Sequence, residues 1–181
     1  MNEEFLIVVD EYDDVIGTQT REKCHFGEGI LHRAIASFVF NGKNKLLLAQ
    51  RSELKTLWPR FWDASCCTHV YPGEIYKQAG ERRLSEELGF SCKLKSLTKF
   101  KYQARYKNNG SENEMCVLLM GRHSGEVKPN PKEVASCKWV DIDDLRKEIN
   151  NNPDNYTPWL KIALAEYLKT KGRHPTLPMV E

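Results

Sequence analysis

The sequence lacks the features that would place the chain in a membrane or outside the cell. It has no apolar run near the roughly 20 residues that a membrane-spanning helix needs. Its first residues, MNEEFLIVVDEYDD, are acidic, and their apolar part is too short for a signal peptide. We therefore expect a cytoplasmic protein without a membrane span.

An excess of charge of one sign is also lacking, because 27 lysines and arginines stand against 25 aspartates and glutamates. The formal net charge of +2 gives no global attraction to nucleic acid. One segment, KLKSLTKFKYQARYK (93–107), interleaves basic and aromatic residues as single-strand binders do. The same alternation is typical of a half-exposed strand at a sheet edge. We expect no nucleic-acid partner.

The six cysteines do not have the spacing of a small disulfide-stabilised domain. Without a secretion signal we expect reduced thiols, and a bridge between the neighbours Cys66 and Cys67 would be strained. The stretch CCTH (66–69) lacks the two-residue gap of a zinc knuckle. In an extended segment, Cys67 and His69 would share one face and Cys66 would point to the other. A small buried thiol is the commoner state of a free cysteine, so the pattern alone leaves core packing and a functional site open.

The remaining pattern predicts an α+β fold, a mixed β-sheet flanked by helices in a single domain. Apolar or alternating runs predict strands at 5–10, 31–40, 46–52, 94–107, 112–121 and 134–142. Periodic segments predict helices at 74–89, 141–149 and 157–171. Residues 13–17 are expected to form a turn, and the segment that starts at residue 21 is expected to begin as a glycine-bearing loop.

The predicted helix at 74–89 carries a dense group of charges. Arg83 and Glu87 are four residues apart and share one helix face. Solvated ion pairs would explain this pattern. A site for Mg²⁺ and a diphosphate would explain it too, since hard cations prefer oxygen ligands and bring substrate phosphates with them.

The spacing of this helix resembles the Nudix box, which ends in Arg-Glu-apolar-x-Glu-Glu-x-Gly-apolar. The matching residues are Glu74, Arg82, Leu84, Glu86, Glu87, Gly89 and Phe90. Thr68 stands in place of the first glycine of the box, and Arg83 in place of a glutamate. Loss of that carboxylate counts against hydrolysis of a pyrophosphate, whereas a cation there suits holding a diphosphate.

Two glutamates fall on one face of the predicted strand at 112–121. Glu112 and Glu114 would share that face with Cys116, Leu118 and Met120, which suggests that it turns inward. Buried carboxylates need partners, and a divalent metal is one such partner. An exposed start of the strand, just after the turn at 108–111, is the alternative.

Taken in order, five segments resemble type 1 isopentenyl-diphosphate delta-isomerases, which belong to the Nudix superfamily. They are GTQTREKCHFGEGILHRAIASFVF, AQRSELKTLWPRFWDASCCTHVYPGE, AGERRLSEELGF, FKYQARYKNNGSENEMC and YTPW. The resemblance implies a single Nudix-like catalytic domain over residues 1–171 and a C-terminal tail at 172–181. It also implies metal-dependent interconversion of isopentenyl and dimethylallyl diphosphate in isoprenoid biosynthesis, with a prenyl diphosphate as the small-molecule substrate.

The resemblance further implies two metal sites and a set of cations for the diphosphate. A buried Zn²⁺, Mn²⁺ or Mg²⁺ would be held by His25, His32, His69, Glu112 and Glu114. A Mg²⁺ that accompanies the substrate would be held by Glu87 and the backbone carbonyl of Cys67. The cations that match diphosphate-binding positions are Arg51, Lys55 and Arg83, and Arg21 stands where the family has a lysine.

The implied reaction adds a proton to one end of an alkene and removes another beside it, through a tertiary carbocation. Such chemistry needs an acid and a base on opposite sides of a flat substrate. The family's pair matches Cys67 and Glu114, with Tyr102 assisting beside Glu114. Trp159 matches an aromatic ring that faces the cation, a contact worth ~2 kcal/mol when desolvated. From helical spacing alone, core packing of Trp159 is the simpler interpretation.

A Nudix hydrolase of a nucleoside or prenyl diphosphate is the alternative function, because it would share the fold and the Mg²⁺ site. Arg83 and the presence of Cys67 count against it. A noncatalytic domain would leave the histidines and glutamates unexplained. The sequence predicts no oligomeric state.

Overall fold

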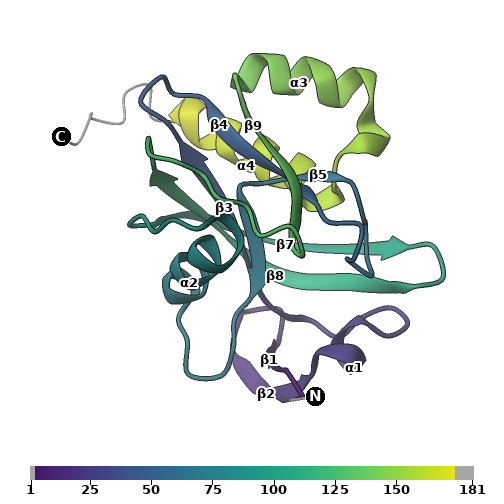
Figure 1. Cartoon of the computed structure of the whole chain (residues 1–181). Coiled ribbons are helices and arrows are strands. Elements are labelled where there is room, and N and C mark those ends of the chain that lie inside the picture. Colours follow the sequence, from purple (N-terminus) through teal and green to yellow (C-terminus); the bar gives the residue numbers. More distant parts are fainter. Residues whose placement is uncertain (1–2, 174–181) are drawn as a thin grey trace.

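Strand β3 (His32–Phe40) lies at the centre of the fold, within residues 3–173, which this computed structural model describes (Figure 1). It pairs in parallel with β8 (Gly110–Arg122) along its whole length. Three strands follow one another along its other edge and pair with it antiparallel: β1 (Phe5–Val9), β6 (Cys66–His69) and β4 (Leu46–Arg51). This branching curls the sheet and brings residues from distant segments together.

Within residues 3–173 the remaining strands extend the sheet outward to nine. They are β2 (Val15–Thr20) beside β1, β5 (Trp62–Asp63) and β9 (Val134–Val140) beside β4, and β7 (Lys95–Tyr106) beside β8. The helices are α1 (Arg21–His25), α2 (Tyr76–Leu88), α3 (Ile142–Asn151) and α4 (Pro158–Arg173), with a short 3-10 turn, η1 (Pro153–Asn155). None of the helices in this described part is long and apolar enough to cross a membrane.

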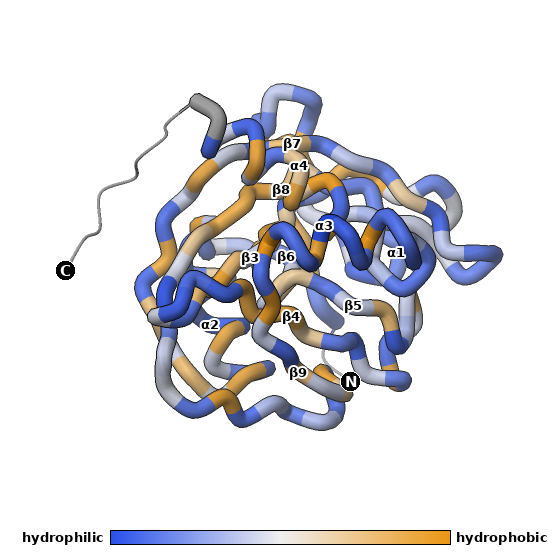
Figure 2. The backbone as a smooth tube through the Cα atoms, turned by 90° about the horizontal axis from the view of Figure 1, so that it is seen from above, coloured by the Kyte–Doolittle hydropathy of each residue, from blue (hydrophilic) through white to orange (hydrophobic). Residues whose placement is uncertain are grey.

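Alternation along β3 divides the core into two layers. Ile35 and Val39 pack with α2 residues such as Leu84, whereas Phe38 packs with α4 residues such as Leu160. This follows from the period of two, which points successive side chains to opposite faces of a strand. Figure 2 shows the hydrophobic stretches gathered in the central strands, with hydrophilic loops outside.

Helix α2 lies very close to the sheet because Gly80 has no side chain. A Cβ at this position would come within 2.7 Å of side-chain atoms of both Leu94 and Leu119. The helix ends at Gly89, whose φ of 71° is in the left-handed region that glycine adopts without strain. These two glycines set the position of the charged residues in the last turns of α2.

Two predictions near the N-terminus were wrong. Residues 13–17 do not form only a turn, because strand β2 begins at Val15. Its residues are mostly exposed, so it lacks the apolar alternation that marks a strand. The segment from Arg21 begins as helix α1, and the Thr20 hydroxyl accepts the Lys23 N–H at its start. A helix of five residues is too short to show a period.

The other predicted strands and helices are present. The turn after Phe40 joins β3 to β4, but only Phe40 and Leu46 pair before β4 turns away to β9. Helix α4 continues to Arg173, two residues beyond the predicted helix at 157–171. Residues 174–181, most of the expected tail at 172–181, lie outside the described residues.

Candidate active site

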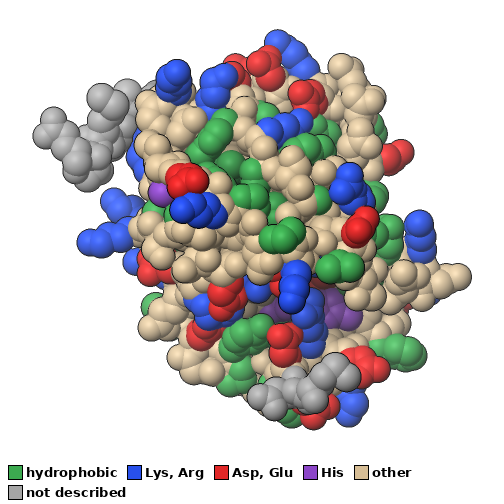
Figure 3. All heavy atoms as spheres, in the orientation of Figure 1, with side chains coloured by type: hydrophobic (Ala, Val, Ile, Leu, Met, Phe, Trp, Pro, Cys, Tyr) green, Lys and Arg blue, Asp and Glu red, His purple; other side chains and the backbone are tan. Residues whose placement is uncertain are grey.

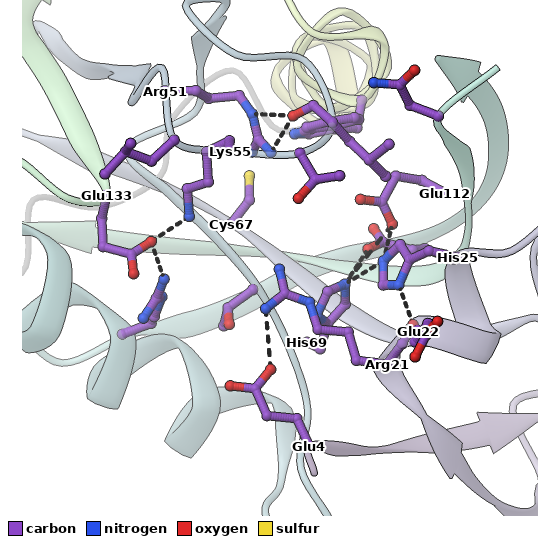
Figure 4. A pocket seen from close by; sticks show the side chains of 18 of the residues that line it. Glu4, Arg21, Glu22, His25, Arg51, Lys55, Cys67, His69, Glu112 and Glu133 are labelled. Atoms are coloured by element: carbon purple, nitrogen blue, oxygen red, sulfur yellow. Dashed lines mark hydrogen bonds and ion pairs between the residues drawn. The ribbon is translucent and has the colours of Figure 1, made fainter. Parts of the chain in front are cut away.

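A pocket of about 680 Å³ opens where β6, β7 and β8 meet helix α1 and the start of α4 (Figure 4). Most of the residues singled out in the sequence line it. They are Arg21, His25, Arg51, Lys55, Cys67, His69, Arg83, Tyr102, Glu112, Glu114 and Trp159. His32 is fully buried below it, and Glu87 lines a small neighbouring cavity that also touches Cys67. Figure 3 shows histidine side chains between basic and acidic side chains on this side of the molecule.

Three histidines and one glutamate form a compact cluster at the floor of the pocket. One ligand atom from each of His25, His32, His69 and Glu112 lies within 4.8 Å of the others. Pairing in the sheet explains part of this arrangement, because His69 lies opposite Ala34 of β3 and His32 opposite Glu114 of β8. Helix α1 brings His25 in from above the sheet.

The hydrogen bonds of the histidines leave ligand atoms turned toward one another. The Nδ1 atoms of His25 and His32 lie 2.6 Å and 2.7 Å from the backbone oxygens of Arg21 and Ile30. A carbonyl oxygen only accepts, so each Nδ1 carries the proton and each neutral ring presents a lone pair at Nε2. This second partner also fixes ring orientation, as it does in known metal sites.

The atoms at the centre of the cluster are left without ordinary partners. His32 Nε2 and Glu112 Oε2 are buried and make no hydrogen bond within the described residues. Glu112 Oε2 is 2.9 Å from His25 Nε2, an ion-pair distance without the direction of a hydrogen bond. His25 Nε2 and His69 Nε2 are only 3.2 Å apart. Buried polar atoms normally find partners, so this donor set fits a divalent metal.

The electrostatics of the cluster favour the neutral form of two of its three histidines. Burial lowers the pKa of His32 to about 3 and that of His69 to about 4. Burial also acts on Glu112, but the adjacent His25 and His69 imidazoles outweigh it and hold the pKa of this carboxyl well below its usual range. A metal that binds His32, His69 and Glu112 would displace few protons from them. At His25 the neighbouring Glu112 charge outweighs burial and raises the pKa.

Glu114 lies at the edge of the cluster and outside the group of four. Its Oε1 is 3.4 Å from His69 Nε2 and 3.7 Å from His32 Nε2, while its Oε2 accepts a hydrogen bond of 2.5 Å from the Tyr102 hydroxyl. Burial and the neighbouring Glu112 charge raise the pKa of Glu114, and burial raises that of Tyr102. Both Glu112 and Glu114 are 7% exposed, so the alternative of an exposed strand start is wrong.

The two neighbouring cysteines point to opposite faces of β6. Cys66 is buried in the layer beside α2, whereas Cys67 lines the pocket and donates its thiol hydrogen to Asp63 Oδ1 over 3.3 Å. Burial raises the pKa of both thiols, and the Asp63 charge adds to this at Cys67. Cys67 is therefore a protonated thiol that lines the pocket and directs its hydrogen to Asp63.

The expected cations fall into two groups on the pocket wall. Lys55 and Arg83 lie together: both contact Glu133, and they approach Glu87 at 3.5 Å and 2.8 Å. Arg51 is separate, because its guanidinium bonds Asp63 and the backbone oxygens of the following loop. Arg21, half exposed at the rim, pairs with Glu4 at 3.1 Å. Glu87 thus lies with the cations and apart from the histidine cluster.

Comparison with known proteins places this site in a family. A model of the NUDIX domain matches residues 30–160. "Isopentenyl-diphosphate Delta-isomerase 2" of Photorhabdus laumondii is 42% identical over 159 residues, which cover 88% of this chain and 89% of the relative. The chain belongs to the isopentenyl-diphosphate Delta-isomerase family. "Isopentenyl-diphosphate Delta-isomerase 1" of Aromatoleum aromaticum is 39% identical over 90% of this isomerase-family chain and 91% of its own.

The solved structures agree on the fold of this isomerase-family chain. The protein DR0079 of Deinococcus radiodurans superposes with a TM-score of 0.73 at 21% identity, over 91% of this chain and 99% of that one. At this identity the likeness concerns the fold alone. The predicted α+β fold, a Nudix-like mixed sheet flanked by helices, is confirmed.

Two residues of this isomerase-family site were not predicted from the sequence. Asp63 bonds Cys67, Trp159 and Arg51, and Glu133 joins Lys55 to Arg83. A signal for Asp63 was present, because it has the same odd parity as Cys67 and His69 in an extended segment. No pattern in the loop around Glu133 marks that residue.

Proposed function

We propose that the chain interconverts isopentenyl and dimethylallyl diphosphate by adding and removing a proton through a tertiary carbocation, as a step of isoprenoid biosynthesis. One observation carries the proposal. A protonated Cys67 thiol and the hydrogen-bonded pair of Tyr102 and Glu114 line the same pocket. An allylic isomerisation needs two such groups, one for each carbon that gains or loses a proton. A positioned acid or base typically contributes 10²–10⁴-fold, so one alone would be insufficient for an unactivated alkene.

Some residues of the pocket transfer protons in this proposal, and others stabilise the positive charge of the carbocation. Cys67 exchanges a proton at one carbon, and Glu114 exchanges the other with Tyr102 as its relay. The ring of Trp159, 3% exposed and 5.9 Å from the Tyr102 ring between centroids, gives the cation an aromatic face. Burial of these groups excludes water, which would otherwise capture the cation.

We propose that the cluster of His25, His32, His69 and Glu112, with Glu114 at its edge, holds a divalent metal. Zn²⁺, Mn²⁺ and Mg²⁺ are candidates: imidazole nitrogens favour Zn²⁺, and carboxylate oxygens suit Mn²⁺ and Mg²⁺. When bound, the metal would neutralise the two carboxylates and fix their orientation. The unpartnered atoms His32 Nε2 and Glu112 Oε2 support this assignment.

The cations on the opposite wall are proposed to bind the diphosphate of the substrate. Lys55, Arg83 and Arg51 supply fixed positive charge, and Arg21 lies at the rim. Glu87 and the backbone carbonyl of Cys67 would hold a Mg²⁺ that accompanies the diphosphate, since Mg²⁺ prefers few protein oxygens together with phosphate. We place the protein in the cytoplasm, where its six free cysteines stay reduced.

Deuterium incorporation tests the proposal. Purified protein with Mg²⁺ and isopentenyl diphosphate in deuterated water is expected to yield deuterated dimethylallyl diphosphate, followed by proton and phosphorus NMR. Release of phosphate without an allylic product would contradict the isomerase and support a Nudix hydrolase of a prenyl diphosphate instead. A parallel incubation with a nucleoside diphosphate tests the other hydrolase substrate.

A further inference from the structure

Asp63 is a buried carboxylate that no part of the proposed reaction uses directly. It ends strand β5, is 4% exposed, and lines the small cavity that neighbours the pocket. Its Oδ1 accepts from Trp159 Nε1 at 2.7 Å, from the Thr157 hydroxyl at 3.1 Å and from the Cys67 thiol at 3.3 Å. The amide of Ala64 is a further donor at 2.7 Å.

The other oxygen of Asp63 faces a cation. Arg51 Nη1 lies 3.2 Å from Oδ2, and the remaining nitrogens of that guanidinium bond the backbone oxygens of Leu57 and Trp58. The guanidinium is also 5.2 Å from the centroid of the Trp159 ring. One carboxylate therefore joins a thiol, an indole ring and a diphosphate-facing cation.

These contacts bring together four separate segments of the chain. Arg51 comes from β4, Cys67 from β6 and Trp159 from the first turn of α4. Trp159 Nε1 has no other hydrogen-bond partner among the described residues, so without Asp63 its buried N–H would be left unsatisfied. An ionised acceptor is suited to this role, because hydrogen bonds to charged groups are shorter and stronger than neutral ones.

We propose that Asp63 is a positioning residue of the isomerisation, which sets the Cys67 thiol, the Trp159 ring and the Arg51 guanidinium in one fixed arrangement around the substrate. This inference rests on the proposed isomerase function. Asp63 does not touch the reacting carbons in this account and exchanges no proton with them. Its effect passes through the three residues that it holds.

The Trp159 indole provides a readout that does not depend on catalysis. In ¹⁵N-tryptophan-labelled protein, the Trp159 indole proton, assigned with Trp159→Phe, is expected to resonate downfield and to exchange slowly with solvent. Asp63→Asn keeps the shape and one acceptor oxygen but removes the charge, so the proton is expected to move upfield. In Asp63→Ala it is expected to move further and to exchange faster.

Kinetics then separate positioning from mere stability. Because a misplacement of about 1 Å can cost roughly 10²-fold, we expect kcat to fall about 10²-fold in Asp63→Ala. A smaller fall is expected in Asp63→Asn. The KM for isopentenyl diphosphate is expected to rise several-fold in both, since Arg51 loses its partner.

Asp13→Asn is the matched control. Asp13 is similarly buried, at 9% exposed, and also accepts from an arginine and a hydroxyl, Arg33 and Tyr76. It does not line the pocket. We expect this variant to lower the melting temperature while leaving kcat, KM and the Trp159 resonance unchanged.

The outcomes distinguish failure of this inference from failure of the proposed function. Folded Asp63 variants with wild-type kcat and KM would overturn the role of Asp63 alone. If the variants do not fold, the wild-type protein still decides, because a rapidly exchanging Trp159 indole proton without a downfield shift would overturn it. Wild-type protein that forms no allylic product would overturn the isomerase, and the positioning role with it.

Discussion

Tyr102 donates its hydroxyl hydrogen to Glu114 Oε2 over 2.5 Å, from the directly opposite position on the neighbouring strand. His32 continues the same row on β3, opposite Glu114 on its other side. Three adjacent strands thus carry a hydroxyl, a carboxylate and an imidazole in line. Such a row connects the interior of the pocket to the histidine cluster, so changes at Tyr102 should act on proton transfer.

We predict that Tyr102→Phe lowers kcat for the isomerisation by on the order of 10²-fold, the low end for a positioned proton donor. The KM should change little, because the ring keeps its packing and the diphosphate cations are untouched. Steady-state rates by NMR would measure both. Tyr106→Phe, on the same strand and outside the pocket lining, is the control. An unchanged kcat in Tyr102→Phe would remove the hydroxyl from the mechanism.

The neighbouring thiols provide a second prediction. Cys67→Ala should abolish turnover, since it removes the only thiol that lines the main pocket among the described residues. Cys66→Ala should largely preserve kcat and lower stability, because it leaves a small cavity in the layer beside α2. Rates and melting temperatures of both variants would decide. Equal loss of activity in both variants would contradict the assignment of Cys67 to the pocket face of β6 and of Cys66 to its core face.

Arg83 and Arg82 are adjacent on α2 but face different surroundings. Arg83 lines the pocket, whereas Arg82 pairs with Glu74 at 2.6 Å and with Glu86. We predict that Arg83→Gln raises the KM for isopentenyl diphosphate about tenfold or more, as expected for loss of one charge-assisted contact. Arg82→Gln should leave the KM near the wild-type value. A similar increase of the KM in both variants would contradict a specific role of Arg83 and would indicate a general effect of positive charge on α2.

Metal content tests the histidine cluster. After dialysis, the wild-type protein should retain about one tightly bound divalent metal per chain, measured by inductively coupled plasma mass spectrometry. His69→Ala and Glu112→Ala should lose it, and a strong chelator should lower the melting temperature of the wild type, since a ligand of the folded state stabilises it. His123→Ala, where His123 stacks on Phe90, is the control. Full metal content in His69→Ala would contradict the assignment.

The pKa values of His32 and His69 predict how the metal-free protein responds to acid. Both lie below the unfolded value of 6.5, at about 3 and about 4, so the unfolded chain binds more protons between these limits. Stability is therefore present above pH 6.5 and lost as the pH falls toward 4, by up to about 1.4 kcal/mol per pH unit for each histidine.

Urea titrations of the metal-free protein at several pH values would measure this slope. Glu112 contributes in the same direction at lower pH, because its pKa is held below the usual range. His25 and Glu114 contribute in the opposite direction, because their pKa values are raised. His32→Asn should reduce the slope between pH 6.5 and 4. An unchanged slope in that variant would show that His32 is not buried in its neutral form.

Local patterns were sufficient for the parts of the fold that have a period. The apolar runs of β3 and β8 and the spacing of α2 each predicted their element. Strand β2 and helix α1 were missed, because an exposed edge strand and a five-residue helix show neither alternation nor helical period. Tertiary pairing with β1 and the Thr20 cap define these elements.

Local sequence patterns also predict only part of the site. The shared face of Cys67 and His69 follows from strand geometry, and so does that of Glu112 and Glu114. The partners of Asp63 do not, because Trp159 lies 96 residues further along the chain. Only the packing of α4 against the sheet brings that indole to the carboxylate. The odd parity that Asp63 shares with Cys67 could have marked it as a site residue, but it could not have predicted the hydrogen bond to Trp159.

The late position of α4 in the chain has a consequence for synthesis on the ribosome. All of the histidines and carboxylates of the cluster lie within the first 114 residues, whereas Trp159 lies in α4, the last helix that the structure describes, and Thr157 directly precedes it. Contacts so distant in sequence form late, since loop closure must precede them. Until α4 emerges, a nascent chain therefore leaves uncovered the apolar layer around Phe38 and Phe40, against which Leu160 packs in the folded protein.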